Sequence, residues 1–336
     1  MRRLQPITQE EWLQCNEYNR NITEEFLMNS PQLSDKTKKA YLSNLMIWFN
    51  WVRLFLNNKA QYEIKSIEYM RYQNWLISMD HSSADVTNKR AAVSTLNNYI
   101  VLYYSDDFPT FRNFIVKGMP KPEASYVNEK NPPTKEEFFN IVDVMKQREE
   151  WQKVAYLLYT FDTGCRRAES IQLLKEVVNY EPTIKEKKVF NEDGSSELKT
   201  VKYYMSNQTR CKGRGKTGKV RKLVFSEETM DAIKKWLEVR GDDDCPYVFV
   251  STRNGEITQL SESTLNKWAT NVFSPILGRR FHPHSMREAR ATIGVVEEGK
   301  SVESVQKLLG HESSSTTEGH YIIRQDADEA IDELFL

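Results

Sequence analysis

The chain has 336 residues, of which 39% are hydrophobic and 28% charged, a length and composition that favour two domains with separate cores. Its formal net charge of zero at pH 7 excludes a simple polycationic coat for nucleic acid, although a local basic face can still bind DNA because affinity follows the local field. No apolar run approaches a membrane span, the first residues lack the core of a secretory signal, and the four scattered cysteines fit neither a disulfide frame nor a zinc site, so we expect a reduced cytoplasmic protein with no membrane contact.

Helices dominate the first third of the chain, where we expect an extension over residues 1–20 and a helical domain over 21–117. After Ser34, a helix-capping residue, apolar side chains recur in steps of three and four: Tyr41, Leu45, Trp48, Phe49, Val52 and Phe55. The opposite face carries Lys36, Lys38 and Lys39. Similar stripes predict helices near residues 69–79 and 84–104. We expect a small bundle whose core includes Tyr41, Trp48, Trp75 and Tyr103.

A linker and a second domain follow. Residues 118–133 hold four prolines and no apolar period, which is typical of an extended linker. Thr134 and Glu137 have capping-box spacing and open a domain over 134–324, with a buried helix over 154–161 that stops at Gly164. Between about 177 and 225 the pattern predicts a hairpin with a turn at 191–194 and a third strand at 221–225. Helices are expected from 227–239 to the end.

A basic stretch lies within the predicted hairpin region, over residues 202–224. It contains no Asp or Glu, and its cations are Lys202, Arg210, Lys212, Arg214, Lys216, Lys219, Arg221 and Lys222. A charge run of this kind is most often a solvated surface. Here three glycines (Gly213, Gly215 and Gly218) relax the loop, so that its cations could follow a phosphate backbone.

Residues 163–169 (Thr-Gly-Cys-Arg-Arg-Ala-Glu) form a second candidate element. A glycine turn between two helices places Arg166 near a helix N-terminus, where backbone N–H groups favour an anion. Glu169, three residues later, could hold the guanidinium in place. By itself, the motif equally fits an ordinary helix-ending glycine followed by a surface arginine.

Four of the five histidines fall within residues 282–324: His282, His284, His311 and His320. Together with Arg287 they form a concentration of cations that repel one another unless an anion lies between them. Tyr321 could then attack a bound phosphate. Other meanings remain open, since the histidines could be loop residues, the cluster could bind a metal, and Tyr321 could belong to the core. No acidic residue or cysteine stands at ligand spacing beside His282 and His284, so we expect no metal site.

Taken in order, these motifs resemble those of the tyrosine recombinases, or phage integrases. The match includes residues 163–169, the basic hairpin, residues 283–287 (Pro-His-Ser-Met-Arg), residues 308–311 (Leu-Leu-Gly-His) and a following tyrosine, and residues 33–41 resemble the first helix of the core-binding domain. The resemblance implies a mostly α fold with a small β-hairpin or sheet. A helical core-binding (SAM-like) domain and a mixed α/β catalytic domain would close on DNA as a C-shaped clamp.

The resemblance also implies a role for each matching residue. Arg166 and Arg287 would hold the scissile phosphate. His284 would accept a proton or donate a hydrogen bond to the phosphate, and His311 would donate a hydrogen bond to the phosphate. Tyr321 would form a 3′-phosphotyrosyl bond, and a turn lysine would protonate the leaving 5′-oxygen. That lysine is Lys216, since residues 216–224 fit the family's Lys-x-x-Lys-x-Arg-x-x-Val pattern, with Lys212 as the alternative. Glu169 would support the site, and we expect DNA contacts from Lys36, Lys38, Lys39, Lys212, Arg214, Lys219 and Arg221.

Two positions depart from the family pattern. The usual distance from the second histidine to the tyrosine is nine residues, but Tyr321 follows His311 by ten and His320 occupies the expected position. The residue after the second arginine is commonly histidine and here is Glu288. One extra residue in the intervening loop would absorb the first departure, and no other tyrosine is near, so Tyr321 remains the expected nucleophile. The second departure adds a carboxylate beside the site, where it could brace Arg287 or another cation.

The function implied is site-specific strand exchange on duplex DNA with inverted-repeat targets, integrating or excising a phage or mobile element without a cofactor. The resemblance further implies a homotetramer on DNA, a monomer or weak oligomer when free, an accessory directionality factor and a nucleoid-associated location. The acidic tail, residues 325–336, would pack against a neighbouring protomer or its own. Alternatives are a type IB topoisomerase, a metal-dependent nuclease using the His cluster, and a DNA-binding module without catalysis.

Overall fold

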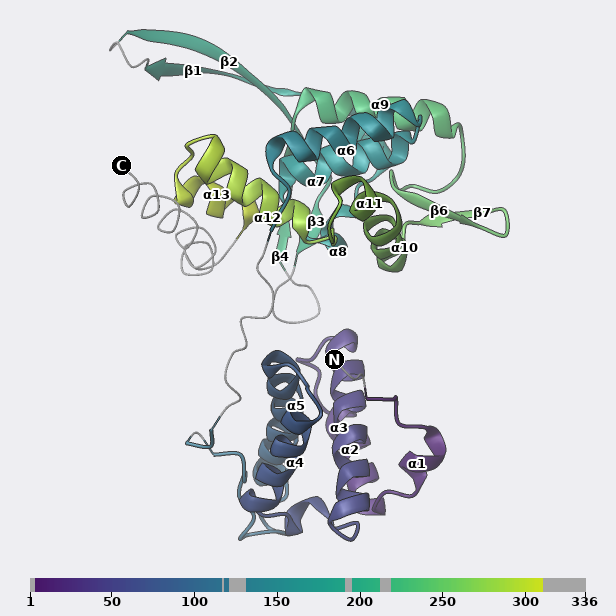
Figure 1. The fold of residues 1–336 in the computed structure, drawn as a ribbon, viewed down its shortest axis with the longest axis vertical. Coiled ribbons are helices and arrows are strands. Elements are labelled where there is room, and N and C mark those ends of the chain that lie inside the picture. Colours follow the sequence, from purple (N-terminus) through teal and green to yellow (C-terminus); the bar gives the residue numbers. More distant parts are fainter. Residues whose placement is uncertain (1–3, 117, 121–130, 191–194, 212–218, 311–336) are drawn as a thin grey trace. The chain divides into compact units, whose positions relative to one another are not determined.

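A computed structural model describes residues 4–116, 118–120, 131–190, 195–211 and 219–310. The chain divides near residue 130 into two compact units (Figure 1), which we call the N-terminal unit and the C-terminal unit. Within these residues, no helix is both long and apolar enough to cross a membrane.

The N-terminal unit is made of helices. They are α1 (Gln9–Leu13), α2 (Glu17–Met28), α3 (Asp35–Phe55), α4 (Ser66–Ser78) and α5 (Ser83–Tyr103), with a 3-10 turn η1 (Gln61–Glu63) before α4. The Ser34 hydroxyl accepts a hydrogen bond from the Thr37 N–H and so caps α3, as the sequence predicts. Trp48 lies at the centre with no exposed surface, 4.8 Å from the ring of Tyr72. Its indole N–H donates to the side chain of Gln61 at 2.9 Å, so the buried polar group is satisfied.

Within residues 1–20, the expected N-terminal extension, the structure has α1, and α2 begins at Glu17. One expectation for this unit needs correction. Tyr103 is 65% exposed and is not a core residue, because it is the last residue of α5, where its ring lies 4.8 Å from that of Tyr99 at an interplanar angle of 50°. Trp48 is buried as predicted, and Tyr41 and Trp75 are half-buried at the edge of the core.

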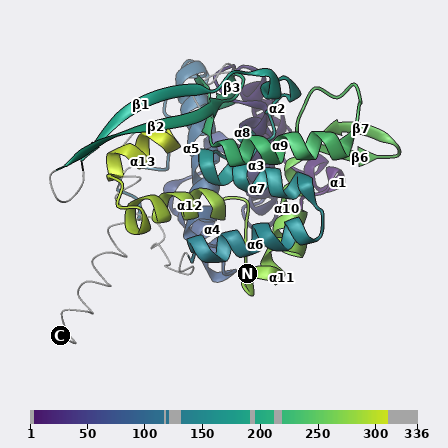
Figure 2. The ribbon, with the colours of Figure 1, turned by 90° about the horizontal axis from the view of Figure 1, so that it is seen from above.

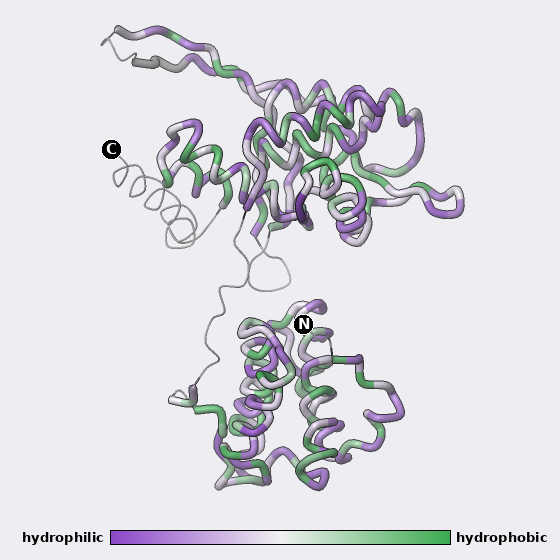
Figure 3. The backbone as a smooth tube through the Cα atoms, viewed as in Figure 1, coloured by the Kyte–Doolittle hydropathy of each residue, from purple (hydrophilic) through white to green (hydrophobic). Residues whose placement is uncertain are grey.

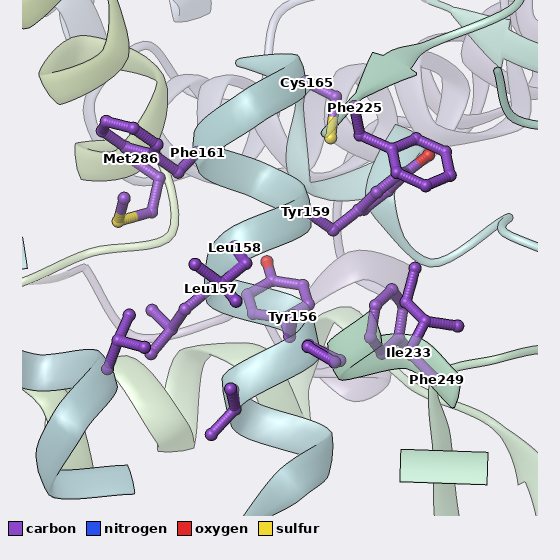
Figure 4. Packing of buried hydrophobic residues seen from close by; sticks show 14 of the residues in the cluster. Tyr156, Leu157, Leu158, Tyr159, Phe161, Cys165, Phe225, Ile233, Phe249 and Met286 are labelled. Atoms are coloured by element: carbon purple, nitrogen blue, oxygen red, sulfur yellow. The ribbon is translucent and has the colours of Figure 1, made fainter. Parts of the chain in front are cut away.

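The C-terminal unit is built around one buried helix, α7 (Trp151–Thr163). Every residue from Val154 to Phe161 is buried, so this helix must be surrounded by other elements. The tube coloured by hydropathy shows hydrophobic residues gathered at this centre (Figure 3). The side chains of Tyr159 and Phe161 point to different sides of the helix, toward Phe225 and Met286 respectively (Figure 4). Two helices run beside α7 (Figure 2), namely α6 (Lys135–Gln147), opened by the predicted capping box, and α9 (Glu227–Arg240).

The remaining helices follow the chain around this centre. They are α8 (Arg167–Ser170), the 3-10 turn η2 (Lys175–Asn179), α10 (Glu262–Trp268), the π-helix η3 (Ala269–Phe273), α11 (Ser274–Leu277), α12 (Ser285–Thr292), the π-helix η4 (Ile293–Glu297) and α13 (Val302–Leu309). α12 packs against both α7 and α13, and this brings the second half of the unit to the end of the buried helix.

In the described part of the C-terminal unit, three small antiparallel sheets accompany the helices. β1 (Thr183–Phe190) pairs with β2 (Ser196–Met205), and the end of β2 pairs with β5 (Val224–Phe225). β3 (Thr209–Cys211) pairs with β4 (Lys219–Arg221). The single strand predicted at 221–225 is therefore wrong, because its two ends join different sheets.

A third hairpin, β6 (Val250–Arg253) with β7 (Glu256–Gln259), interrupts the region where only helices were expected after residue 239. Asn254 and Gly255 link the strands, both with positive φ (52° and 80°). An Asn-Gly pair between two β-prone runs is a strong hairpin signal, so this element was available in the sequence and was missed.

Candidate active site

The site forms where the end of α7 meets the ends of α12 and α13. Gly164 ends α7 with φ of +52°, a left-handed conformation that suits glycine. A Cβ atom on Gly164 would collide with the side chain of Leu309, the last residue of α13. The glycine therefore reverses the chain and lets α13 approach closely. Both effects bring Arg166, two residues later, to the junction.

Arg166 and Glu169 hold each other at the start of α8. The Glu169 carboxylate accepts from the Arg166 backbone N–H and from its Nη1, each at 3.0 Å. Burial acts to raise the pKa of Glu169, but these hydrogen bonds and the charges of Arg166 and Arg221 outweigh it, so the pKa lies below its ordinary value. The Arg166 side chain keeps 28% of its surface exposed. Its guanidinium is thus held by Glu169 and still partly accessible to a ligand.

The adjacent Arg167 turns another way. Its Nη1 donates to Asn266 at 2.6 Å and its Nη2 forms an ion pair with Glu262, both on α10. Of the two consecutive arginines, only Arg166 belongs to the site.

Arg287, on α12, is almost completely buried, with 6% of its surface exposed. Its Nη1 donates to the Gly164 carbonyl at 2.5 Å and its Nη2 to the Leu309 carbonyl at 2.8 Å. Burial, followed by the positive charge of Arg166, lowers its pKa to about 10, so it stays charged at neutral pH. A guanidinium has five N–H groups, and these two bonds leave three for a ligand. Two mutually repelling guanidiniums held in place by neutral carbonyls and one carboxylate are an arrangement that can bind an anion.

His284 is the N-cap residue of α12 and contributes an imidazole to the same place. Burial lowers its pKa, and the charges of Arg287, His282 and Arg166 add to the effect against the opposing charge of Glu288. A neutral imidazole at pH 7 can accept a proton. Glu288 is the carboxylate that departs from the family pattern, and one of its oxygens lies 3.7 Å from Nε2 of His282.

Arg221 is the described member of the basic hairpin that points into the protein. It donates from Nε to Sγ of Cys211 at 3.2 Å, from Nη1 to the Leu308 carbonyl at 2.9 Å, and from Nη2 to Glu169 at 3.3 Å. Lys219, two residues earlier on β4, is exposed. In the N-terminal unit, Lys36 and Lys39 are exposed on α3 and Lys38 is half-buried.

Five of the predicted site residues lie outside the described residues: Lys212, Arg214, Lys216, His311 and Tyr321. The segments that contain these residues follow directly after described elements. Residues 212–218 join β3 to β4, and His311 directly follows Gly310, the left-handed C-cap of α13. Among the described residues, no three His, Cys, Asp or Glu side chains gather in a way that could hold a metal ion.

Sequence reasoning missed the main-chain acceptors of this site. The carbonyls of Gly164, Leu308 and Leu309 hold two guanidiniums, and a backbone carbonyl leaves no residue-type signal. It also missed Asp162, whose carboxylate accepts from the N–H of Ser226 at 2.8 Å and from the hydroxyls of Ser226 and Thr229 at 2.6 Å each. Asp162 thereby ties the end of α7 to the start of α9.

Residues 134–328 match the sequence profile of the phage integrase family. The SPbeta prophage-derived recombinase-like protein YomM of Bacillus subtilis (strain 168) is 33% identical over 338 residues, which cover 99% of this chain and 96% of that protein. Tyrosine recombinase XerC of Oceanobacillus iheyensis is 22% identical, with 90% of each chain covered.

Solved structures share the fold. The XerH site-specific recombinase bound to palindromic difH substrate has a TM-score of 0.64 at 16% identity, covering 99% of this chain and 98% of that one. The Tn1549 transposon integrase in complex with transposon right end DNA has a TM-score of 0.63 at 14% identity, covering 90% and 93%. These comparisons agree with the fold class expected from the sequence, mostly helical with small sheets.

Proposed function

Since the chain belongs to the phage integrase family of tyrosine recombinases, we propose that it cuts and rejoins duplex DNA at a defined site through a covalent 3′-phosphotyrosyl intermediate on Tyr321. The observation that carries the proposal is the pair Arg166 and Arg287 at the end of α7, the first held by the Glu169 carboxylate and the second by the carbonyls of Gly164 and Leu309. Both guanidiniums would bind the same phosphodiester group of the DNA.

In this proposal the two arginines bind the non-bridging oxygens of the scissile phosphate. Negative charge on these oxygens grows as the phosphorus becomes five-coordinate, so fixed guanidiniums bind the transition state more tightly than the ground state. The carbonyl bonds to Arg287 and the carboxylate bond to Arg166 keep both from moving as charge develops. The remaining N–H groups of Arg287 are the donors available for this purpose.

Tyr321 is the proposed nucleophile. A phenol has an ordinary pKa near 10, so it needs a proton acceptor to attack at neutral pH. We assign that acceptor to His284, whose pKa is lowered, with His311 donating a hydrogen bond to the phosphate. The new bond joins the phenolic oxygen to phosphorus while the bond from phosphorus to the 5′-oxygen breaks.

The departing 5′-oxygen takes its proton from Lys216 in this scheme, with Lys212 as the alternative donor. Because the energy of the broken phosphodiester is kept in the phosphotyrosine, religation to a new 5′-hydroxyl requires neither a nucleotide nor a metal ion. The reverse attack regenerates the phenol, so the enzyme returns to its starting state.

The biological setting we propose is the movement of a phage or other mobile element. A prophage-derived relative supports this setting, and so does the likeness to a transposon integrase. We further propose that the two units clamp duplex DNA carrying inverted repeats and that four copies assemble there, by analogy with the lambda integrase tetramer bound to a Holliday junction. The acidic tail at 325–336 would tie neighbouring copies together.

The test is a nicked suicide substrate, from which the short strand after the cleavage site diffuses away and leaves any adduct trapped. We expect the wild type to accumulate a protein–DNA adduct that survives denaturant and EDTA. Tyr321→Phe should bind the same DNA and form none. Cleavage that stops in EDTA and leaves no attached protein would instead support a metal-dependent nuclease. An adduct formed by Tyr321→Phe would remove Tyr321 from its role.

The proton donor is tested separately. Lys216→Ala should slow cleavage, and a 5′-bridging phosphorothiolate should restore much of the rate, because a thiolate leaves without protonation. Lys212→Ala is the matched control in the same segment of the sequence and should lose DNA affinity without this rescue. If only Lys212→Ala is rescued, the two assignments exchange. Relaxation of supercoiled DNA without any preferred site would favour the topoisomerase alternative.

A further inference from the structure

Arg221 has three protein partners although it belongs to a strand at the edge of a small hairpin. On β4 the preceding residues, Lys219 and Val220, are exposed, whereas 24% of the Arg221 side chain is exposed. Its three hydrogen bonds run to β3 (Cys211), to α13 (Leu308) and to α8 (Glu169). One guanidinium therefore links three elements that are far apart in the sequence.

The link to Glu169 joins Arg221 to the anion site. The same carboxylate braces Arg166 through Nη1 and the backbone N–H, and only 2% of its side chain is exposed. A buried carboxylate shared by two guanidiniums cannot move toward one without leaving the other. The position of Arg221 is thus coupled to that of Arg166.

The link to α13 is shaped by a glycine. Gly310 ends the helix with φ of +65°, and a Cβ there would lie 2.5 Å from Nη1 of Arg221 and 2.9 Å from its Cζ. The guanidinium therefore occupies the space that any other residue at position 310 would need. Together with the bond from Arg287 to the Leu309 carbonyl, this places two arginines on the last two carbonyls of α13. His311 is the next residue in the chain.

We propose that Arg221 is a positioning residue that fixes the end of α13, and with it the starting point of the segment bearing His311, against the Arg166–Glu169 pair. Its cation is engaged by the protein and does not serve as a contact to the DNA backbone. This inference rests on the proposed function, since it assigns Arg221 to the cleavage step. The competing role is the DNA contact expected from the sequence pattern, and the two roles differ in what they do to binding and to rate.

The experiment compares Arg221→Ala with Lys219→Ala, an exposed neighbour on the same strand. For each, the Kd for duplex target DNA is measured across salt concentrations, and the rate of adduct formation is measured at saturating DNA on the suicide substrate. A lost phosphate contact should reduce the slope of log Kd against log salt by about 1. A misplaced catalytic segment should leave the slope unchanged and reduce the rate by about 100-fold, the effect of a shift of about 1 Å.

We expect Arg221→Ala to show the second pattern and Lys219→Ala the first. Arg221→Lys guards against a variant that fails to fold, since it keeps the charge but has one nitrogen in place of the three that reach Cys211, Leu308 and Glu169. It should bind DNA normally and still cleave slowly. A double-mutant cycle adds a direct measure of coupling. In a His311→Ala background, Arg221→Ala should lower the rate by no more than about threefold, because the two changes disable the same segment.

The inference is overturned if Arg221→Ala and Arg221→Lys cleave at the wild-type rate once saturated, or if their rate losses simply multiply with that of His311→Ala. A reduced salt slope for Arg221→Ala with an unchanged rate at saturation would return Arg221 to the DNA contacts. These results are distinct from failure of the proposed function, in which the wild type itself forms no adduct.

Discussion

Gly164→Ala should destabilise the C-terminal unit through two separable effects. The first is conformational, because alanine in a left-handed position is disfavoured by about 1–2 kcal/mol. The second is steric, because the new methyl group would collide with the Leu309 side chain. Leu309 has no exposed surface and packs with Ala291 and Val305, so it has no open space to move into. Overpacking of a filled core adds about 1–3 kcal/mol.

Gly278→Ala is the matched control. Gly278 also ends a helix in the left-handed region, with φ of 71°, and a Cβ there meets nothing within 4 Å. This variant should therefore show only the conformational effect, about 1–2 kcal/mol. The difference between the two variants isolates the contact between Gly164 and Leu309, and we expect it to be about 1–3 kcal/mol.

Urea unfolding of the wild type and both variants measures this difference, with the slope against urea checked for constancy. The rate of adduct formation, measured without urea at a temperature where both variants are folded, gives the second readout. Because the Gly164 and Leu309 carbonyls both hold Arg287, Gly164→Ala should also slow cleavage, whereas Gly278→Ala should not. Equal destabilisation by the two variants would refute the close approach of α13 to the end of α7.

Three further predictions concern buried or partly buried polar groups. Asp162→Ala should cost about 1–3 kcal/mol, because three donors at the start of α9 lose their acceptor, and urea unfolding should show no comparable loss for the exposed Asp143→Ala. The lowered pKa of His284 predicts that the acid limb of the pH–rate profile for adduct formation has its midpoint below 6.5, and a midpoint above 6.5 would contradict this. Because the folded protein favours neutral His284, the contribution of this residue to stability is likewise lost as the pH falls from the unfolded pKa through the folded one. Glu169→Gln should destabilise the protein by up to about 3–5 kcal/mol at pH 7, since two guanidiniums lose a buried counter-charge. The pKa of Glu169 is lowered from 4.5, so its contribution to the free energy of unfolding is complete above that value and is lost as the pH falls through the folded pKa. The difference in unfolding free energy between Glu169→Gln and the wild type should therefore narrow in acid. A difference that is constant with pH would show that the charge is not responsible.

Local signals in the sequence were sufficient for most of the helices and for the family. The capping box at Thr134 and the cap at Ser34 act over three residues, and the buried run at 154–161 needs only its own composition to indicate a central helix. The motif around Arg166 and that around Arg287 are likewise short and contiguous. Their order along the chain was enough to indicate the tyrosine recombinases, because each motif can be recognised without knowing what it touches.

Only the tertiary structure decided how these residues act on one another. Residue type and charge predict a DNA contact at Arg221, and only the tertiary structure shows that its guanidinium donates to Cys211, Leu308 and Glu169. Arg287 is oriented by two backbone carbonyls that lie 123 and 22 residues away in the chain, and the lowered pKa of His284 follows from burial and from charges gathered there. Burial, long-range acceptors and the space that a glycine leaves open depend on which segments meet in three dimensions, and no local pattern of side chains records that.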